Sequence, residues 1–191
     1  MPTLPFSDNQ WKDILTALDV YGEIHPQSPV RIRKQLKALV LLMRYSGLRI
    51  SDAVVMCAEK IDRSGNMFIY QAKTGMPVKV PLPPVVLEAL EAIYMADGIS
   101  FFWSGNGTLK TALTEWQERL KKVFRIAGIP SGHGHRLRDT FAVELLQRGV
   151  DIQTVSILLG HSSINTTEKS YSPWVKSRQV ALEVAVRLAC T

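Results

Sequence analysis

The chain has 191 residues, of which 46% are hydrophobic and 21% charged, a balance typical of one globular domain with a substantial core. No apolar run approaches the roughly 18 residues that a membrane-spanning helix requires, and the N-terminus shows no signal-peptide pattern. The two cysteines, Cys57 and Cys190, have neither metal-ligand spacing nor a disulfide framework around them. We therefore expect a reduced, cytoplasmic protein.

The net charge is +6 and the isoelectric point is about 9.4. Such a balance favours a polyanionic partner, because lysine and arginine displace counterions from phosphate backbones. Charge alone does not separate this interpretation from simple solubility, and the clustering is more informative. The basic residues gather as Arg31, Arg33, Lys34 and Lys37, as Arg119, Lys121, Lys122 and Arg125, and as Arg136 with Arg138.

The first part of the chain predicts two helices and a tight corner. A short helix over residues 8–19 would be capped by Ser7 or Asp8, and a polar stretch follows it. Apolar residues then recur at helical spacing over residues 33–46, and Gly47 stands where a C-terminal cap belongs.

The stretch "GLRISDAVVM" predicts that a helix restarts directly after this cap, with Ser51 or Asp52 as its N-cap. Arg49 would then lie in the corner between two helices. A cap-bonding or solvated arginine is the simpler interpretation of this residue taken alone.

Over residues 66–82 the pattern of apolar residues changes to the two-residue period of a β-strand. "MFIYQAK" and "VKVPL" predict two strands joined by a Thr-Gly-Met-Pro turn, and residues 59–62 are a candidate third strand. Helices are predicted through the remainder, at residues 84–94, 108–127, 136–148, 152–159, 164–170 and 174–189. The expected fold class is mainly α with a small antiparallel β-sheet (α+β).

The stretch "GHGHRLRDTFAVELL" contains His-x-x-Arg in two registers, His133 with Arg136 and His135 with Arg138. Arg138 borders the apolar face that Phe141 defines, whereas Arg136 is phased away from it. A long cation at the edge of a core needs an anion, either a structural carboxylate or a bound phosphate. Arginine suits phosphate, because its planar group donates two parallel hydrogen bonds.

Three further residues are candidates for catalytic roles. Lys73 lies at the tip of the predicted hairpin, with Lys79 on the returning strand as its competitor. His161 and Tyr171 lie ten residues apart, and a helix cap and a half-buried ring are their structural interpretations. Without a phosphate-binding glycine loop, a zinc motif or a convincing carboxylate pair, the whole set suits metal-free phosphoryl transfer.

At this point the sequence resembles the tyrosine recombinases, or phage-integrase family, over nearly the whole catalytic domain. The resemblance rests on four motifs in order, "GLRISDA", "AKTG…VKVPL", "HRLRDTFA" and "LLGHSSINTTEKSY". It selects the second His-x-x-Arg register, and it implies a tyrosine-recombinase fold without cofactor or metal. The site residues that it implies are Arg49, Lys73, His135, Arg138, His161 and Tyr171.

The resemblance also implies a mechanism on double-stranded DNA. Tyr171 attacks a scissile phosphate and forms a 3′-phosphotyrosyl link, while Arg49 and Arg138 clamp the phosphate and His161 donates a further hydrogen bond. Lys73 protonates the leaving 5′-oxygen. His135 assists proton transfer, and a second strand's 5′-hydroxyl then reverses the step in a tetramer assembled on DNA.

Two features depart from the usual pattern of the family. Asp139 stands where the family often has a second histidine, and the interval from His161 to Tyr171 is one residue longer than the commonest one. We expect residues 1–174 to form the catalytic domain and residues 175–191 a C-terminal helix exchanged between protomers. The family's N-terminal core-binding domain is expected to be absent from this chain.

Two other classes of function remain open from the sequence. One is a catalytically silent relative that only binds or bends DNA, and a covalent-trapping assay separates it from an enzyme. The other is a type IB topoisomerase-like nicking-closing enzyme, which would act on a single supercoiled duplex.

Overall fold

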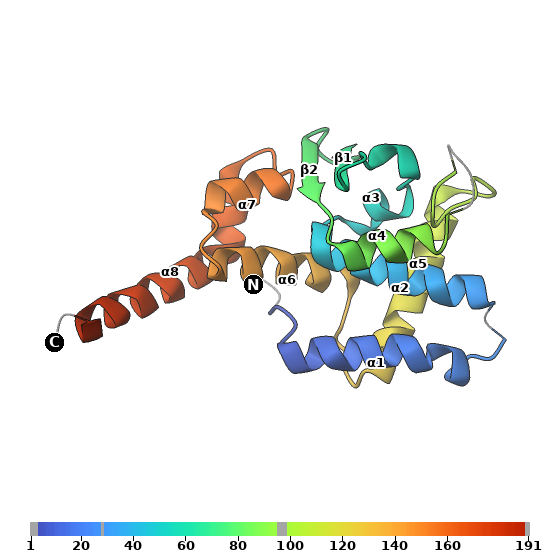
Figure 1. The fold of residues 1–191 in the computed structure, drawn as a ribbon, viewed down its shortest axis with the longest axis horizontal. Helices are drawn as coiled ribbons and strands as arrows, with labels where there is room; N and C mark the ends of the chain where they lie inside the picture. The colour runs from blue at the N-terminus through green and yellow to red at the C-terminus, as the bar shows by residue number, and fades with distance from the viewer. Residues whose placement is uncertain (1–3, 28, 95–98, 190–191) are drawn as a thin grey trace.

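The computed structural model describes residues 4–27, 29–94 and 99–189, and beyond residue 175 it describes side chains at only a few positions. Its elements are α1 (Asp8–Ile24), α2 (Val30–Ser46), α3 (Ile50–Val54), the 3₁₀ turn η1 (Ala58–Lys60), β1 (Asn66–Tyr70), β2 (Pro77–Pro81), α4 (Pro84–Glu91), α5 (Leu109–Ile126), α6 (Gly134–Gln147), α7 (Ile152–Leu158) and α8 (Ile164–Ala189). Helices with one small antiparallel sheet confirm the predicted α+β class (Figure 1). Within the described ranges, no helix is long and apolar enough to cross a membrane.

The central helix is α2, which packs against α1, α4 and α6 (Figure 1). Its apolar residues continue around most of the circumference, and Leu36, Leu39 and Leu42 are fully buried. The helix ends at Gly47 as predicted, in a left-handed conformation with φ of +66°. A Cβ at Gly47 would lie 2.5 Å from the Phe141 ring, so both the backbone and the space require glycine.

The first helix is longer than predicted. Ser7 caps α1, and its side chain and that of Gln10 exchange hydrogen bonds with each other's backbone N–H groups. The helix then continues beyond the predicted end, to Ile24, because Tyr21 is buried and its ring packs 4.7 Å from that of His25. Burial of one aromatic ring has extended the helix into a stretch whose polarity predicted a loop.

The predicted hairpin is present, and β1 and β2 pair antiparallel along their whole length. Residues 59–62 do not add a third strand, because only Ile61 forms a bridge, with Met67. The Asp62 carboxylate accepts hydrogen bonds from the backbone and side-chain N–H groups of Asn66, at 2.9 to 3.1 Å. This local turn takes the chain out of strand geometry.

The end of the chain is one helix and not the two predicted. Helix α8 passes through Pro173, although proline in a helix interior costs about 3 kcal/mol. Packing of its first half offsets this cost, since Tyr171 is buried and its ring lies 6.3 Å from that of Trp174. The last part of α8 projects from the body (Figure 1). The apolar side chains of this last part, at residues 180–182 and 184–189, lie outside those that the structure describes.

Candidate active site

Arg49 lies in the corner between α2 and α3, as predicted, and is itself the N-cap residue of α3. Neither Ser51 nor Asp52 caps this helix, so that part of the prediction is wrong. The guanidinium of Arg49 is half-buried, and its Nη1 donates a hydrogen bond to Oε1 of Gln71. The corner therefore holds the guanidinium against the hairpin instead of leaving it in solvent.

The carboxylate of Asp52 explains why it does not cap α3. Its Oδ1 accepts a hydrogen bond from the backbone N–H of Ala72 at 2.9 Å, which ties α3 to the hairpin turn. Its Oδ2 is buried and, among the described residues, has no hydrogen-bond partner. Sequence reasoning missed this role, although the separation of three residues from Arg49 was a usable signal for a shared helical face.

Gln71 is a second residue that sequence reasoning missed. It is buried at the end of β1, and its Nε2 donates to the carbonyl of Leu159 at 2.8 Å while Oε1 accepts from Arg49. The hydroxyl of Thr74 donates to the carbonyl of Gly160 at 2.9 Å. The start of the hairpin turn is therefore joined to the end of α7, a contact between segments nearly ninety positions apart that no local pattern predicts.

The structure separates the two candidate arginines of α6. Arg138 is 1% exposed, and its guanidinium donates to the carbonyls of Gly47 and Leu159, both at 2.6 Å. Arg136 faces the N-terminal segment, where it donates to the Leu4 carbonyl at 2.7 Å and lies 4.3 Å from the centre of the Phe6 ring. Arg138 alone joins the cluster that contains Arg49 and His161.

His161 lies in the loop between α7 and α8. Nη2 of Arg138 lies 3.1 Å from its Nε2, and the hydroxyl of the buried Thr167 lies 2.7 Å from its Nδ1. Because a guanidinium only donates, Nε2 must accept, and Nδ1 therefore carries the proton and donates to Thr167. Burial, with the charges of Arg138 and Arg49, lowers the pKa of His161 to about 4, so the ring is neutral near neutral pH.

The phenol of Tyr171 points into the same cluster. The side chain is 3% exposed, and its Oη donates a hydrogen bond to Oδ1 of Asp139 at 2.7 Å. Burial, followed by the negative charge of Asp139, raises the pKa of Tyr171 well above its ordinary value, while Arg138 and Arg49 lower it. The phenol is thus protonated, although two cations are close enough to stabilise its anion.

His135 is on the first turn of α6 and is more open than the others, with 58% of its side chain exposed. Its Nε2 lies 3.5 Å from Oδ1 of Asp139, one helical turn further along. Burial lowers the pKa of His135, and the charge of Asp139 acts in the opposite direction. Tyr171 and His135 therefore approach the same carboxylate oxygen from two helices.

Lys73 stands apart from these five residues, exposed on the turn between β1 and β2. Its neighbours Gln71 and Thr74 are the residues that fasten the turn to α7. Lys79 lies on β2 and influences the exposed carboxylate of Asp62, away from the cluster. Lys73 is therefore exposed on a turn whose flanking residues are bonded to α7 next to His161.

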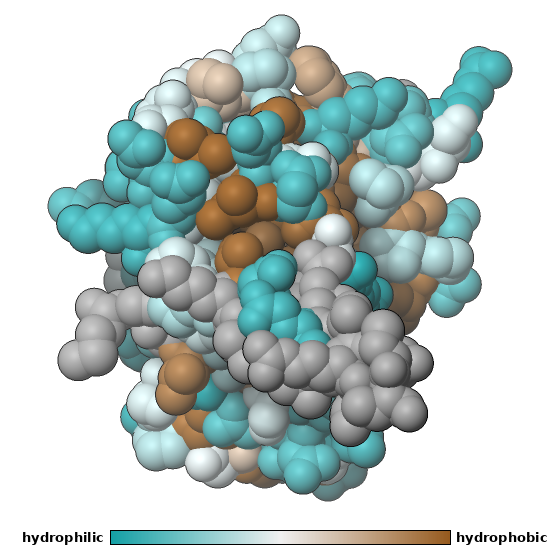
Figure 2. All heavy atoms as spheres, turned by 90° about the vertical axis from the view of Figure 1, so that its left-hand side faces the viewer, coloured by the Kyte–Doolittle hydropathy of each residue, from teal (hydrophilic) through white to brown (hydrophobic). Residues whose placement is uncertain are grey.

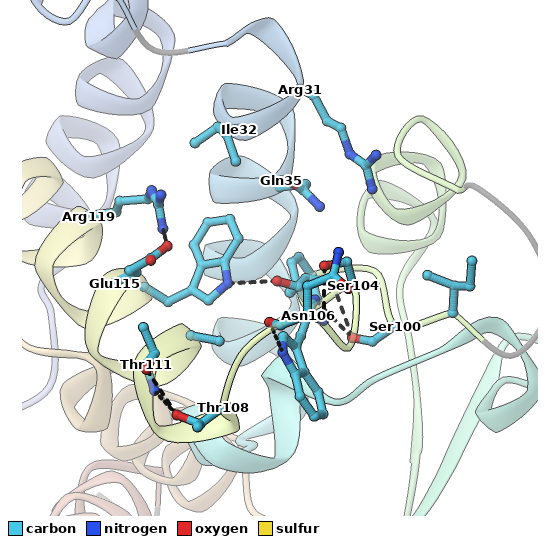
Figure 3. A pocket seen from close by; sticks show the side chains of 15 residues that line it. Arg31, Ile32, Gln35, Ser100, Ser104, Asn106, Thr108, Thr111, Glu115 and Arg119 are labelled. Carbon is cyan, nitrogen blue, oxygen red and sulfur yellow. Dashed lines mark hydrogen bonds and ion pairs between the residues drawn. The ribbon is translucent and has the colours of Figure 1, made fainter.

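A cavity of about 560 Å³ opens beside the cluster. It lies between α5 and the corner before α3, and Arg49 and His135 line it together with Lys121 and His133. A second cavity, of about 410 Å³, lies between α2, α5 and residues 99–108 (Figure 3). Its lining includes the ion pair of Glu115 with Arg119 and none of the six predicted site residues.

The model of the phage integrase family matches residues 6–176, which is most of the chain. The chain belongs to the phage integrase family. Among curated family members, tyrosine recombinase XerD of Mycobacterium leprae is 32% identical over 172 residues, covering 82% of this chain and 53% of the relative.

Tyrosine recombinase XerD of Vibrio cholerae is also 32% identical, over 174 residues that cover 85% of this chain and 54% of the relative. The chain therefore spans about half the length of the curated integrase-family relatives it matches. Among solved structures, the XerA recombinase superposes with a TM-score of 0.70 at 18% identity, covering 98% of this chain and 66% of that one.

XerH bound to a palindromic difH substrate, in a post-cleavage complex, gives a TM-score of 0.71 at 20% identity and covers all of this chain and 54% of that one. At such identities the similarity concerns the fold, and it confirms the predicted catalytic-domain fold of the family.

Proposed function

We propose that this chain is the catalytic part of a site-specific tyrosine recombinase, which cleaves and rejoins double-stranded DNA through a 3′-phosphotyrosyl intermediate. The observation that carries the proposal is the meeting of Tyr171 with Arg49, Arg138 and His161 in one cluster. A phenol beside two guanidinium groups is suited to attack on a phosphodiester, because the cations neutralise the phosphate and stabilise the phenolate.

The two arginines would divide the binding of the phosphate. Arg138 is held by two backbone carbonyls, so its guanidinium is positioned before DNA binds and needs little reorganisation. Arg49 is half-exposed and lines the cavity beside the cluster, so it is the arginine that an incoming phosphate would meet first. Both would donate to the non-bridging oxygens.

His161 would act on the same phosphate after a change of protonation. Its pKa of about 4 reflects burial and two nearby cations, and a phosphate placed between them would offset those charges and raise the pKa. A protonated Nε2 could then donate to a non-bridging oxygen. Thr167 would keep the ring in place through its bond to Nδ1.

Lys73 is proposed to protonate the leaving 5′-oxygen from its place on the hairpin turn. In this step the Tyr171 oxygen gives up its proton to a base in the cluster and bonds to phosphorus. The bond from phosphorus to the 5′-oxygen breaks, and that oxygen takes the ammonium proton. A 5′-hydroxyl from another strand reverses the step. Energy is retained in the ester, and we propose a tetramer on paired sites as the assembly that exchanges strands.

The test is covalent trapping on a pool of nicked duplex oligonucleotides of randomised sequence, followed by denaturing electrophoresis. We expect adducts whose freed strand is labelled directly by polynucleotide kinase, because it carries a 5′-hydroxyl. Adducts should form equally well in excess EDTA, because the arginines and Lys73 would stabilise the charges that metal ions stabilise in other nucleases.

Adducts with a 5′-linkage, or a chemical step lost in EDTA and restored by magnesium, would contradict this mechanism. DNA binding without any covalent adduct would indicate a catalytically silent relative that only binds or bends DNA. Relaxation of a single supercoiled plasmid, without strand exchange between duplexes, would point to the topoisomerase-like alternative.

The projecting end of α8 is proposed to dock on a neighbouring protomer on DNA. Hydrophobic surface gathers on the face from which α8 projects (Figure 2). Ile157 of α7 is 68% exposed and Val175 of α8 is 38% exposed. Apolar side chains in such positions suit contact with a second copy.

We expect a chain truncated after Trp174 to bind the same DNA but to form fewer higher-order complexes and to cleave more slowly. Native electrophoresis and adduct formation at equal DNA occupancy measure both effects. Undiminished assembly and cleavage by the truncated chain would show that the end of α8 has no role between protomers.

A further inference from the structure

The proton of the Tyr171 hydroxyl has to leave as that oxygen bonds to phosphorus, and the cluster contains few groups that can take it. His161 is occupied on both ring nitrogens, because Nε2 accepts from Arg138 and Nδ1 donates to Thr167. His135 contacts Asp139 and not the phenol. Neither histidine is therefore placed to receive this proton directly.

Asp139 is placed to receive it. Its Oδ1 is the atom to which Oη of Tyr171 donates, at 2.7 Å, within the distance that general-base catalysis requires. Its Oδ2 is buried and, over the part of the chain that the structure describes, has no hydrogen-bond partner. A buried carboxylate oxygen without a donor is costly, and the absence of a donor leaves this oxygen's lone pairs unused.

We propose that Asp139 is the general base of the cleavage step and that His135 relays the proton to solvent. This inference rests on the proposed function. The hydroxyl proton of Tyr171 passes to Oδ1 of Asp139 as Oη bonds to phosphorus and the 5′-oxygen departs. His135 is 3.5 Å from the same oxygen and largely exposed, so a small shift lets it carry the proton onward.

The return step uses the same groups in reverse. A 5′-hydroxyl attacks the phosphotyrosyl bond and gives its proton to the Lys73 amine, and the Tyr171 oxygen leaves. Asp139, protonated again through His135, supplies the proton that this oxygen takes up. The titratable groups that face this carboxylate are Tyr171 on α8 and His135 and Arg138 on α6, and the charge of Arg49, at the corner before α3, acts on the Tyr171 phenol and on His135. The two arginines would also stabilise the phenolate that develops as the proton leaves.

The test compares Asp139→Asn with the unaltered chain on oligonucleotides recovered from the trapping pool. The amide has the same shape and can still accept the hydrogen bond from Tyr171, but it cannot take the proton. We expect adduct formation at pH 7 to slow by about 10²- to 10⁴-fold, with DNA affinity unchanged. Between pH 7 and 9 the rate should rise about tenfold per pH unit, because solvent must then deprotonate a phenol whose pKa burial has raised.

Asp151→Asn is the matched control, because Asp151 caps α7 at an exposed position and asparagine caps equally well. It should behave as the unaltered chain does. Thermal unfolding and circular dichroism of Asp139→Asn check that the fold is kept. His135→Gln should slow cleavage less than Asp139→Asn, since it removes only the relay.

If Asp139→Asn cleaves at the normal rate or faster with the normal pH profile, the carboxylate only restrains the phenol and the inference is wrong. If the unaltered chain forms no adduct with any duplex of the trapping pool, the proposed function itself fails. Adduct formation by the unaltered chain distinguishes failure of the proposed function from failure of this inference.

Discussion

Tyr171→Phe is expected to abolish covalent adducts on nicked duplex DNA, to below about one thousandth of the normal amount, because the attacking oxygen is removed. DNA binding should be unchanged, since the ring is buried and contributes no charge to the surface. The loss of the hydrogen bond leaves Oδ1 of Asp139 without its phenolic donor, which we expect to cost about 1–3 kcal/mol of unfolding free energy. Adduct yield, DNA affinity and urea unfolding measure the three effects.

Tyr45→Phe is a matched control for this change. Its ring is half-buried and packs edge-on against Trp11 at 6.2 Å, outside the cluster. It should leave adduct formation intact. Adducts that persist in Tyr171→Phe would reassign the nucleophile to another tyrosine, with Tyr45, Tyr70 and Tyr94 to be tested in turn.

Arg138→Gln is expected to reduce cleavage by about 10²- to 10³-fold or more, because a preorganised cation for the phosphate is lost. A neutral amide also replaces a fork that donates to two buried carbonyls and to His161. We expect a loss of about 1–3 kcal/mol in unfolding free energy. The pKa of His161 should rise from about 4, since the charge of Arg138 lowers it, and an NMR titration of its ring measures this.

Arg136→Gln provides the comparison within the same helix. Arg136 is also buried and binds backbone carbonyls, but its partners are Leu4 and Pro5 in the N-terminal segment. Arg136→Gln should lose a similar amount of unfolding free energy, but its cleavage rate and the pKa of His161 should be unchanged. Equal cleavage by the two variants would show that Arg138 has only a structural role.

Much of this architecture depends on short-range patterns and could be predicted. The cap at Gly47, the turn of the hairpin and the N-cap at Asp151 each depend on the preferences of a few adjacent residues. The apolar face of α5 likewise follows from the spacing of its apolar residues, which predicts one helix. Four separate motifs then supplied the family and all six candidate residues.

The predictions that failed concern competition between local preference and distant packing. Pro173 and the polar stretch after residue 19 both signal a break, yet burial of Tyr171 and Tyr21 keeps the two helices continuous. The strand predicted over residues 59–62 failed for a local reason, because the Asp62 carboxylate binds Asn66 and forms a turn there. In the two helices, a contact energy of a few kcal/mol exceeds a local preference of similar size, and the sequence shows only the preference.

Helix periods, turn residues and motif spacing are local properties, and they were enough to predict the family, the helical fold class and the candidate chemistry. Tertiary packing sets three further features: which arginine of α6 enters the cluster, how Gln71 joins the hairpin to α7, and the hydrogen bond from the hydroxyl of Tyr171 to Asp139. These contacts join residues 21 to 91 positions apart. They form only when packed helices bring the groups together and exclude the water that would otherwise satisfy them.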